Sequence, residues 1–183
     1  AEFMASLFDI PHNKPIISIL DAGAGSGHLS IALVERLRKE TPDSEVQLTC
    51  YETDDKILPI LKSNLDSLGK GNFSYIIKEE HYILSQAHQY NATLDGLVNK
   101  VEYDFIIGNP PYVTYHDLSV NERDILRKKY VTCKKGRFDY CYAFIEQSVN
   151  SLQEKGKLAY IVPNSILKNV WAEDLREFLH PYL

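Results

Sequence analysis

Short apolar segments alternate along this chain with amphipathic segments whose apolar residues recur at helical spacing. Strands are predicted at residues 15–23, 45–54, 73–77, 103–109 and 157–167. Helices are predicted at residues 28–40, 55–69, 120–130, 139–156 and 170–179, while residues 84–100 are polar and show no clear period. Because strands separated by helices pair in parallel, the pattern predicts an α/β fold: an open, mostly parallel, Rossmann-like sheet with helices on both faces.

Residues with distinctive chemistry follow four of the predicted strands. They are Asp21–Gly27, Glu52, the segment after Ile77, and Asn109–Tyr112. In open parallel sheets, ligands bind outside the carboxyl ends of the strands. The sequence therefore predicts that these segments lie along one edge of the sheet and share a ligand.

The first of these segments, DAGAGSG, has glycines at alternate positions: Gly23, Gly25 and Gly27. Such a turn lets the backbone approach a ligand closely. The fingerprint for nicotinamide cofactors places its third glycine one residue later, and the carboxylate of Asp21 would repel a pyrophosphate. The turn therefore disfavours a nicotinamide-dependent oxidoreductase and favours a ligand with a cationic amino acid end.

The second predicted strand ends in Tyr51-Glu52-Thr53. An acid at this place can accept hydrogen bonds from both hydroxyls of a ribose. A ribose joined to an amino acid head describes S-adenosylmethionine, so that the glycine turn and Glu52 together predict this cofactor.

The stretch Asn109-Pro110-Pro111-Tyr112 stops the apolar run of the fourth predicted strand. An aromatic amine or a side-chain amide is a poor nucleophile, since its lone pair is delocalised. The side-chain oxygen of Asn109 and the backbone carbonyl of Pro110, aimed by two prolines of fixed φ, could accept its hydrogens and favour attack on a methyl group. Catalysis is therefore predicted to depend on Asn109, Pro110, Pro111 and Tyr112.

Tyr112 offers a flat face on which a planar substrate group can stack. A base inside a duplex must first be flipped out, which costs a few kcal/mol. Stacking on an aromatic side chain, at ~1–3 kcal/mol per base, would offset much of that cost.

The net charge of the 183 residues is −5, which argues against binding of nucleic acid through bulk charge. A local basic stretch exists at residues 127–137, and its lysines are candidate DNA contacts: Lys128, Lys129, Lys134 and Lys135. No apolar run reaches the ~20 residues of a membrane span. The cysteines Cys50, Cys133 and Cys141 fit no zinc spacing, so we expect no metal and buried or inert thiols in a reducing cytoplasm.

The motifs DAGAGSG, YETD, NPPY and IVPNSIL, in this order, resemble the gamma-class adenine-N6 DNA methyltransferases of restriction–modification systems. The segment FMASLF resembles the helix that precedes the glycine turn in that class. The resemblance covers nearly the whole chain. It implies a class I S-adenosylmethionine-dependent methyltransferase fold, methyl transfer to the N6 amine of a flipped adenine in double-stranded DNA, and a place in the cytoplasm of a prokaryote.

The resemblance also implies roles for individual residues. Asp21 and Gly23 would contact the methionine end of the cofactor, and Glu52 its ribose. The cofactor site would also include Ala22, Gly25, Gly27 and Thr53. Asn109, Pro110 and Tyr112 would hold the target adenine. Phe144 would pack near the cofactor adenine or the catalytic loop.

The chain departs from the pattern of that class in three places, one of which is that the Thr-Pro of the family's first motif would lie before Ala1. The family has Asp-Phe after its third strand to bind the cofactor's adenine, whereas this chain has Glu80, His81 and Tyr82, which become the candidates for that contact. The chain also lacks the DNA-recognition domain and the strand after its last helix. We therefore expect residues 1–183 to be a methyltransferase catalytic domain, truncated on the C-terminal side. We expect it to bind DNA through a longer parent protein and to turn over poorly or not at all alone.

Two other functions fit some of these residues. A methyltransferase that modifies a glutamine side chain of peptide release factors shares the glycine turn and NPPY, but the basic stretch at 127–137 and Val162-Pro163-Asn164-Ser165 favour DNA. A non-catalytic nucleic-acid-binding module of the same fold would be expected to have lost Asn109 or Tyr112. The sequence contains no nuclease constellation.

Overall fold

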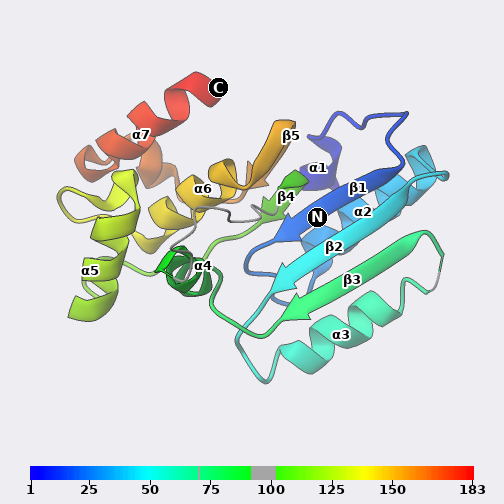
Figure 1. The fold of residues 1–183 in the computed structure, drawn as a ribbon, viewed down its shortest axis with the longest axis horizontal. Helices are drawn as coiled ribbons and strands as arrows, with labels where there is room; N and C mark the ends of the chain where they lie inside the picture. The colour runs from blue at the N-terminus through cyan, green and yellow to red at the C-terminus, as the bar shows by residue number, and fades with distance from the viewer. Residues whose placement is uncertain (70, 92–101) are drawn as a thin grey trace. The chain divides into compact units, whose positions relative to one another are not determined.

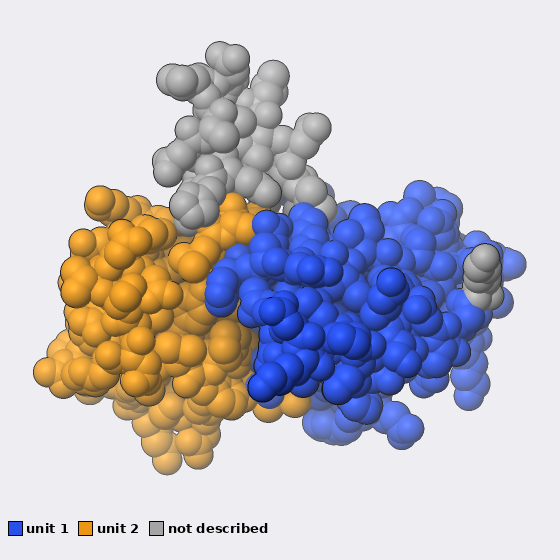
Figure 2. Space-filling view, turned by 90° about the horizontal axis from the view of Figure 1, so that it is seen from below, with its two compact units in different colours: residues 1–82, 99–109, 151–160 blue, residues 83–98, 110–150, 161–183 orange. Residues whose placement is uncertain are grey.

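The computed structural model describes residues 1–69, 71–91 and 102–183. The chain forms two compact units (Figure 2). The first comprises residues 1–82, 99–109 and 151–160, and the second comprises residues 83–98, 110–150 and 161–183. The chain therefore passes between the two units several times, and each unit is built from three separate segments.

The first unit contains a five-stranded sheet (Figure 1). Its strands are β1 (Ile16–Asp21), β2 (Glu45–Tyr51), β3 (Phe73–Lys78), β4 (Tyr103–Gly108) and β5 (Leu152–Tyr160). The order across the sheet is β3-β2-β1-β4-β5, and all four pairings are parallel. This sheet and its helices confirm the predicted α/β, Rossmann-like fold.

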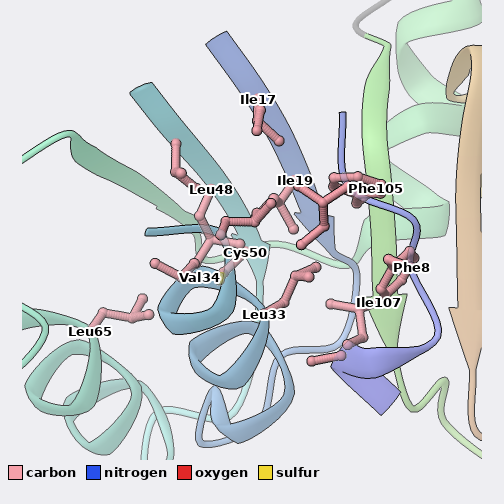
Figure 3. Packing of buried hydrophobic residues seen from close by; sticks show 14 of the residues in the cluster. Phe8, Ile17, Ile19, Leu33, Val34, Leu48, Cys50, Leu65, Phe105 and Ile107 are labelled. Carbon is pink, nitrogen blue, oxygen red and sulfur yellow. The ribbon is translucent and has the colours of Figure 1, made fainter. Parts of the chain in front are cut away.

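Three helices pack their apolar residues onto the sheet of the first unit: α1 (Glu2–Ser6), α2 (His28–Glu40) and α3 (Leu58–Asp66). Leu33 and Val34 of α2 lie with Ile19 and Cys50 in one buried cluster (Figure 3). Leu65 of α3 joins the same cluster. A fully buried side chain of this size contributes about 1.5–3 kcal/mol, so this layer stabilises the sheet.

The prediction of one long helix over residues 139–156 is wrong at its end. The helix α6 (Tyr140–Asn150) stops earlier, and β5 begins at Leu152. The backbone N–H of Tyr103 donates to the carbonyl of Ser151 at 2.8 Å, and Lys155 has a φ of 66° within an irregular stretch of the β4–β5 pairing. Tertiary pairing with β4 thus outcompetes the helical spacing of this segment.

The second unit is mainly helical. It contains α4 (Tyr82–Asn91) from residue 83 onward, α5 (Val120–Lys129), α6 and α7 (Glu173–Leu179). Short 3-10 helices lie at Val131–Cys133, Asn164–Leu167, Val170–Ala172 and His180–Tyr182. A capping box of Ser119 and Glu122 begins α5. The aromatic residues Tyr130, Phe138 and Tyr142 are fully buried in it. Residues 84–91 are helical, although their polar sequence shows no clear period, and residues 92–100 of that segment lie outside the described residues.

Candidate functional site

The sheet has a topological switch point between β1 and β4. These strands are neighbours, pairing Ile19 with Phe105 and Leu20 with Ile106, although they are far apart in the chain. The strands that follow β1 are added on one side of it and β4 with β5 on the other. Ligands of open α/β sheets bind outside the carboxyl ends at such a point. Here those ends carry Asp21 and the Gly108-Asn109 pair.

Asp21 is the last residue of β1, and its carboxylate is buried. Ser30 of α2 donates its hydroxyl to Oδ2, and the backbone N–H of Gly23 donates to the same carboxyl group. The second oxygen, Oδ1, is buried without a hydrogen-bond partner. A buried acceptor without a donor is costly and is uncommon in folded proteins, so it marks a place where a ligand's donor can bind.

Burial raises the pKa of Asp21 to about 7. The hydrogen bonds from Ser30 and Gly23 oppose this shift, and the nearby charge of Glu52 adds to it. A carboxyl group with this pKa is partly protonated near neutral pH, and a cation placed beside it would draw it into the charged form.

The glycine turn is held in shape from two sides. Gly27 has a φ of 82°, and a Cβ there would lie 2.7 Å from Leu61 Cδ1 of α3. The amide of Asn64 donates to the carbonyl of Ser26 at 2.8 Å. Gly25, with a φ of 54°, has no heavy atom within 4 Å of where its Cβ would be. The turn therefore presents backbone to open space at Gly25 while α3 fixes its other end.

Glu52 follows β2 and binds the glycine turn directly. Its Oε2 accepts the N–H of Gly25 at 2.8 Å, and its Oε1 accepts the N–H groups of Thr53 at 2.7 Å and Asp54 at 2.9 Å. A carboxylate has about four acceptor sites, so three backbone bonds leave one of them open. Glu52 therefore lies where the sequence predicts, and it ties the carboxyl end of β2 to the turn after β1.

The carboxyl end of β4 lies against Asp21. A Cβ at Gly108 would lie 3.1 Å from Asp21 Oδ1 and 3.1 Å from Tyr160 Cε1 of β5. A side chain at residue 108 would crowd both neighbours, so glycine favours this approach, which brings Asn109 directly after the strand to the same edge as Asp21. Asn109 is exposed. The structure thus gathers Asp21, the glycine turn, Glu52 and Asn109 within the first unit, as predicted.

The candidates for contact with a cofactor adenine follow β3. Glu80 and His81 are exposed, whereas Tyr82 is buried with its ring edge against Tyr51, the two ring centroids 4.9 Å apart. Lys78 donates to the hydroxyl of Tyr51 at 2.9 Å. The contact of Glu80, His81 or Tyr82 with a cofactor adenine therefore stays a prediction.

The remaining predicted residues belong to the second unit. Pro110 is buried, and Tyr112 is 52% exposed with its hydroxyl donating to the carbonyl of Ile161 at 3.0 Å. Phe144 is buried in α6, with its ring edge against Tyr140. The predicted roles of these residues toward a cofactor or a base stay predictions.

The four candidate lysines of the basic stretch differ in their surroundings. Lys128, Lys134 and Lys135 are exposed, and Lys135 lies 3.7 Å from the carboxylate of Asp174. Lys129 is half-buried, and burial lowers its pKa to about 8 against the opposing charge of Glu146. Lys129 is therefore a weaker cation near pH 8 than its neighbours.

Three residues of this sheet edge were missed by sequence reasoning. Ser30 donates to Asp21, Asn64 holds the turn, and Gly108 makes room for the carboxylate. A glycine that ends an apolar strand is a signal of close approach, but nothing in the sequence indicates the partners of Ser30 and Asn64.

All three cysteines are buried and unpaired, as expected of inert thiols. Among the described residues, no group of His, Cys, Asp and Glu side chains is arranged to hold a metal ion, and no helix is long and apolar enough to span a membrane.

Known structures resemble this fold. A structure described as a class I S-adenosylmethionine-dependent methyltransferase from Listeria monocytogenes aligns with a TM-score of 0.72 at 17% identity, over 98% of this chain and 49% of that one. The methyltransferase subunit of a type I restriction-modification system from Streptococcus thermophilus aligns with a TM-score of 0.65 at 16% identity, over 97% of this chain and 36% of that one. The fold is therefore that of the class I S-adenosylmethionine-dependent methyltransferases.

Sequence relatives point in the same direction. The chain is 27% identical over 170 residues to the type II methyltransferase M.AccI of Acinetobacter calcoaceticus, covering 91% of this chain and 27% of that protein. It is 42% identical over 129 residues to the type II restriction enzyme and methyltransferase RM.Eco57I of Escherichia coli, covering 69% of this chain and 12% of that protein. The chain thus spans about a quarter or less of the length of these relatives. Residues 29–182 match the family described as Eco57I restriction-modification methylase. The chain belongs to the Eco57I restriction-modification methylase family.

Proposed function

We propose that this protein transfers a methyl group from S-adenosylmethionine to the N6 amine of a flipped adenine in double-stranded DNA, as the modification enzyme of a restriction–modification system. The observation that carries the proposal is the switch point between β1 and β4, which has a buried acceptor at Asp21, while the sequence NPPY begins at Asn109, directly after β4. The family and the names of the relatives support DNA as the substrate. Residues 1–183 would form the catalytic domain.

The residues at the edge of the sheet fit S-adenosylmethionine. Its α-amino group and sulfonium carry positive charge and suit Asp21, whose Oδ1 lacks a donor. Its ribose suits Glu52, which retains an acceptor site after three backbone bonds. The open space beside Gly25 accommodates a close ligand. When bound, this cofactor supplies an electrophilic methyl group.

The residues that follow β4 act on the amine. The amide oxygen of Asn109 and the carbonyl of Pro110 accept hydrogen bonds from the N–H groups of adenine N6. These acceptors pull the nitrogen toward a tetrahedral shape and stabilise the positive charge that develops on it during attack. Pro110 and Pro111 hold the acceptors in a fixed backbone conformation, which reduces the reorganisation needed at the moment of reaction.

Tyr112 supplies the platform for the flipped base. The residue is 52% exposed and its hydroxyl donates to the carbonyl of Ile161, which favours one orientation of the ring. Stacking there at ~1–3 kcal/mol offsets much of the cost of flipping. The exposed lysines Lys128 and Lys134 contribute attraction to the DNA backbone.

The experiment that tests the proposal follows the methyl group. The full-length protein is incubated with radiolabelled S-adenosylmethionine and either duplex DNA or a release-factor peptide, and the modified base is identified by digestion and chromatography. Label in N6-methyladenine is expected. Label in a glutamine side chain would support the rival protein methyltransferase, and label in neither substrate would indicate a non-catalytic module.

A further inference from the structure

Two arginines of α5 converge on one tyrosine ring in the second unit. The Cζ of Arg123 lies 4.4 Å and the Cζ of Arg127 5.4 Å from the ring centroid of Tyr115. Phe138 packs its edge on Tyr115, with centroids 5.4 Å apart, and also lies 5.8 Å from the Cζ of Arg127. The four side chains form what we call the arginine–aromatic cluster. Its first member, Tyr115, lies three residues after Tyr112 in the sequence.

The hydrogen bonds of this cluster are incomplete. Arg123 Nη2 donates to the carbonyl of His116 at 3.2 Å. Arg127 Nη2 donates to the hydroxyl of Tyr115 at 3.1 Å and to the carbonyl of Gly136 at 3.0 Å. The Nε–H groups of both arginines are buried without an acceptor. An unsatisfied buried donor costs about 1–3 kcal/mol, and more when it is charged, so a pair of them needs an explanation.

The charges of the cluster are also uncompensated. Within the described part of the chain, neither Arg123 nor Arg127 forms an ion pair with a carboxylate. The two side chains stand four residues apart on one helix, where like charges destabilise each other. Between Arg123 and Arg137 the sequence has seven basic residues and only one acidic residue, Asp124, although the whole chain has a net charge of −5. Two guanidinium groups held beside the same tyrosine ring without a carboxylate are suited to receive an anion.

We propose that Arg123 and Arg127 form a binding site for one phosphate of the DNA backbone beside the target base. This inference rests on the proposed function and adds to it a specific contact that the sequence did not indicate. Tyr115 holds the guanidinium group of Arg123, and Tyr115 with Phe138 holds that of Arg127, before DNA arrives, so that little side-chain entropy is lost on binding. One phosphate then offsets the repulsion between the arginines.

The salt dependence of DNA binding tests this site. Fluorescence anisotropy with a labelled duplex gives the slope of log affinity against log salt for the wild-type protein and for Arg123→Gln/Arg127→Gln. The slope is expected to become shallower by about one in the double variant, which corresponds to one lost phosphate contact. The matched control is Lys39→Gln/Lys62→Gln, which removes the same charge from two exposed lysines of α2 and α3. The control slope is expected to stay at the wild-type value, and an equal change in both variants would overturn the proposal.

A second measurement uses only the wild-type protein, in case the double variant fails to fold. Duplexes that carry one neutral methylphosphonate at a time are titrated with the protein. A methylphosphonate at one position beside the target base is expected to lower the affinity and make the salt dependence shallower. Unchanged affinity at every position would overturn the site. If the protein methylates DNA but the slope is unchanged in the double variant, the proposed function stands and the phosphate site is overturned. If the protein transfers no methyl group but the slope changes in the double variant, the phosphate site stands and the proposed function is overturned.

Discussion

The last glycine of β4 lies against the buried carboxylate that ends β1: a Cβ on Gly108 would be 3.1 Å from Asp21 Oδ1. This closeness joins the glycine turn to the strand that carries Asn109. We expect Gly108→Ala to push on Asp21 and Tyr160, to cost about 1–3 kcal/mol of unfolding free energy, and to weaken cofactor binding. Gly69→Ala is the control, because its Cβ meets nothing within 4 Å and only its φ of 69° is strained. Urea unfolding and calorimetry check both variants, and cofactor affinity that falls equally in the two would contradict the role of Gly108.

The raised pKa of Asp21 predicts a pH-dependent stability. Its pKa is about 7 in the folded protein against an ordinary value of 3.8, so between these values the folded state holds a proton that the unfolded state has released. The contribution of this group to stability is therefore complete below pH ~4 and is lost as pH rises through ~7. Asp21→Asn removes this pH dependence. The free energy of unfolding of the variant, relative to that of the wild type, should therefore be higher at pH 8 than at pH 5 by on the order of 3 kcal/mol. The variant should be more stable than the wild type at pH 8. Urea unfolding at the two pH values measures it, and an equal effect at both would contradict the buried acid.

Glu52 binds the glycine turn, and under the proposed function it also binds the cofactor ribose; substitutions can separate the two. Glu52→Gln keeps one acceptor oxygen for the backbone but loses the charge, and we expect cofactor affinity to fall by about tenfold, since a hydrogen bond to a charged group contributes roughly 1.5–3 kcal/mol. Glu52→Ala should also release the N–H of Gly25 and lower the melting temperature. Calorimetric titration with S-adenosylmethionine and thermal unfolding separate the two effects. Unchanged affinity in both variants would show that the ribose is held elsewhere.

The lysines of the basic stretch should contribute unequally to DNA binding. Lys128 is exposed, whereas Lys129 is half-buried with a pKa near 8, so Lys129 is partly neutral at that pH. Lys128→Gln is expected to flatten the salt dependence of DNA binding by the full-length protein more than Lys129→Gln does at pH 8. Anisotropy titrations at several salt concentrations compare them. A larger effect for Lys129→Gln would contradict this ranking.

Much of the first unit could be predicted from the sequence because its patterns are local. The apolar spacing of Leu33, Val34 and Leu37 predicts α2 with the bounds that the structure has, and the apolar run before Gly108 predicts β4. Prediction failed after Asn150, where pairing with β4 decides the structure and helical spacing does not. The spacing of apolar residues within a segment does not indicate which distant strand, here β4, the segment pairs with.

Some residues of the candidate site were likewise predictable from the sequence, and others were not. Asp21, Glu52 and Asn109 stand at strand ends, which the sequence indicates, so their shared edge was predictable. Ser30 and Asn64 act through contacts with Asp21 and Ser26 that only folding creates. The convergence of Arg123 and Arg127 on Tyr115 was hidden for the same reason, because their helical spacing alone is typical of a solvated face.

The most direct test of the central claim compares Asn109→Ala with the wild-type full-length protein in two assays. Single-turnover transfer of a labelled methyl group to duplex DNA reports on the acceptor at Asn109, and calorimetric titration with S-adenosylmethionine reports on the edge formed by Asp21 and Glu52. We predict that transfer is lost, by at least a hundredfold, as on removal of one preorganised group from a transition state, while cofactor affinity stays within about twofold of wild type. Methyl transfer that persists in Asn109→Ala at the wild-type rate would contradict the account.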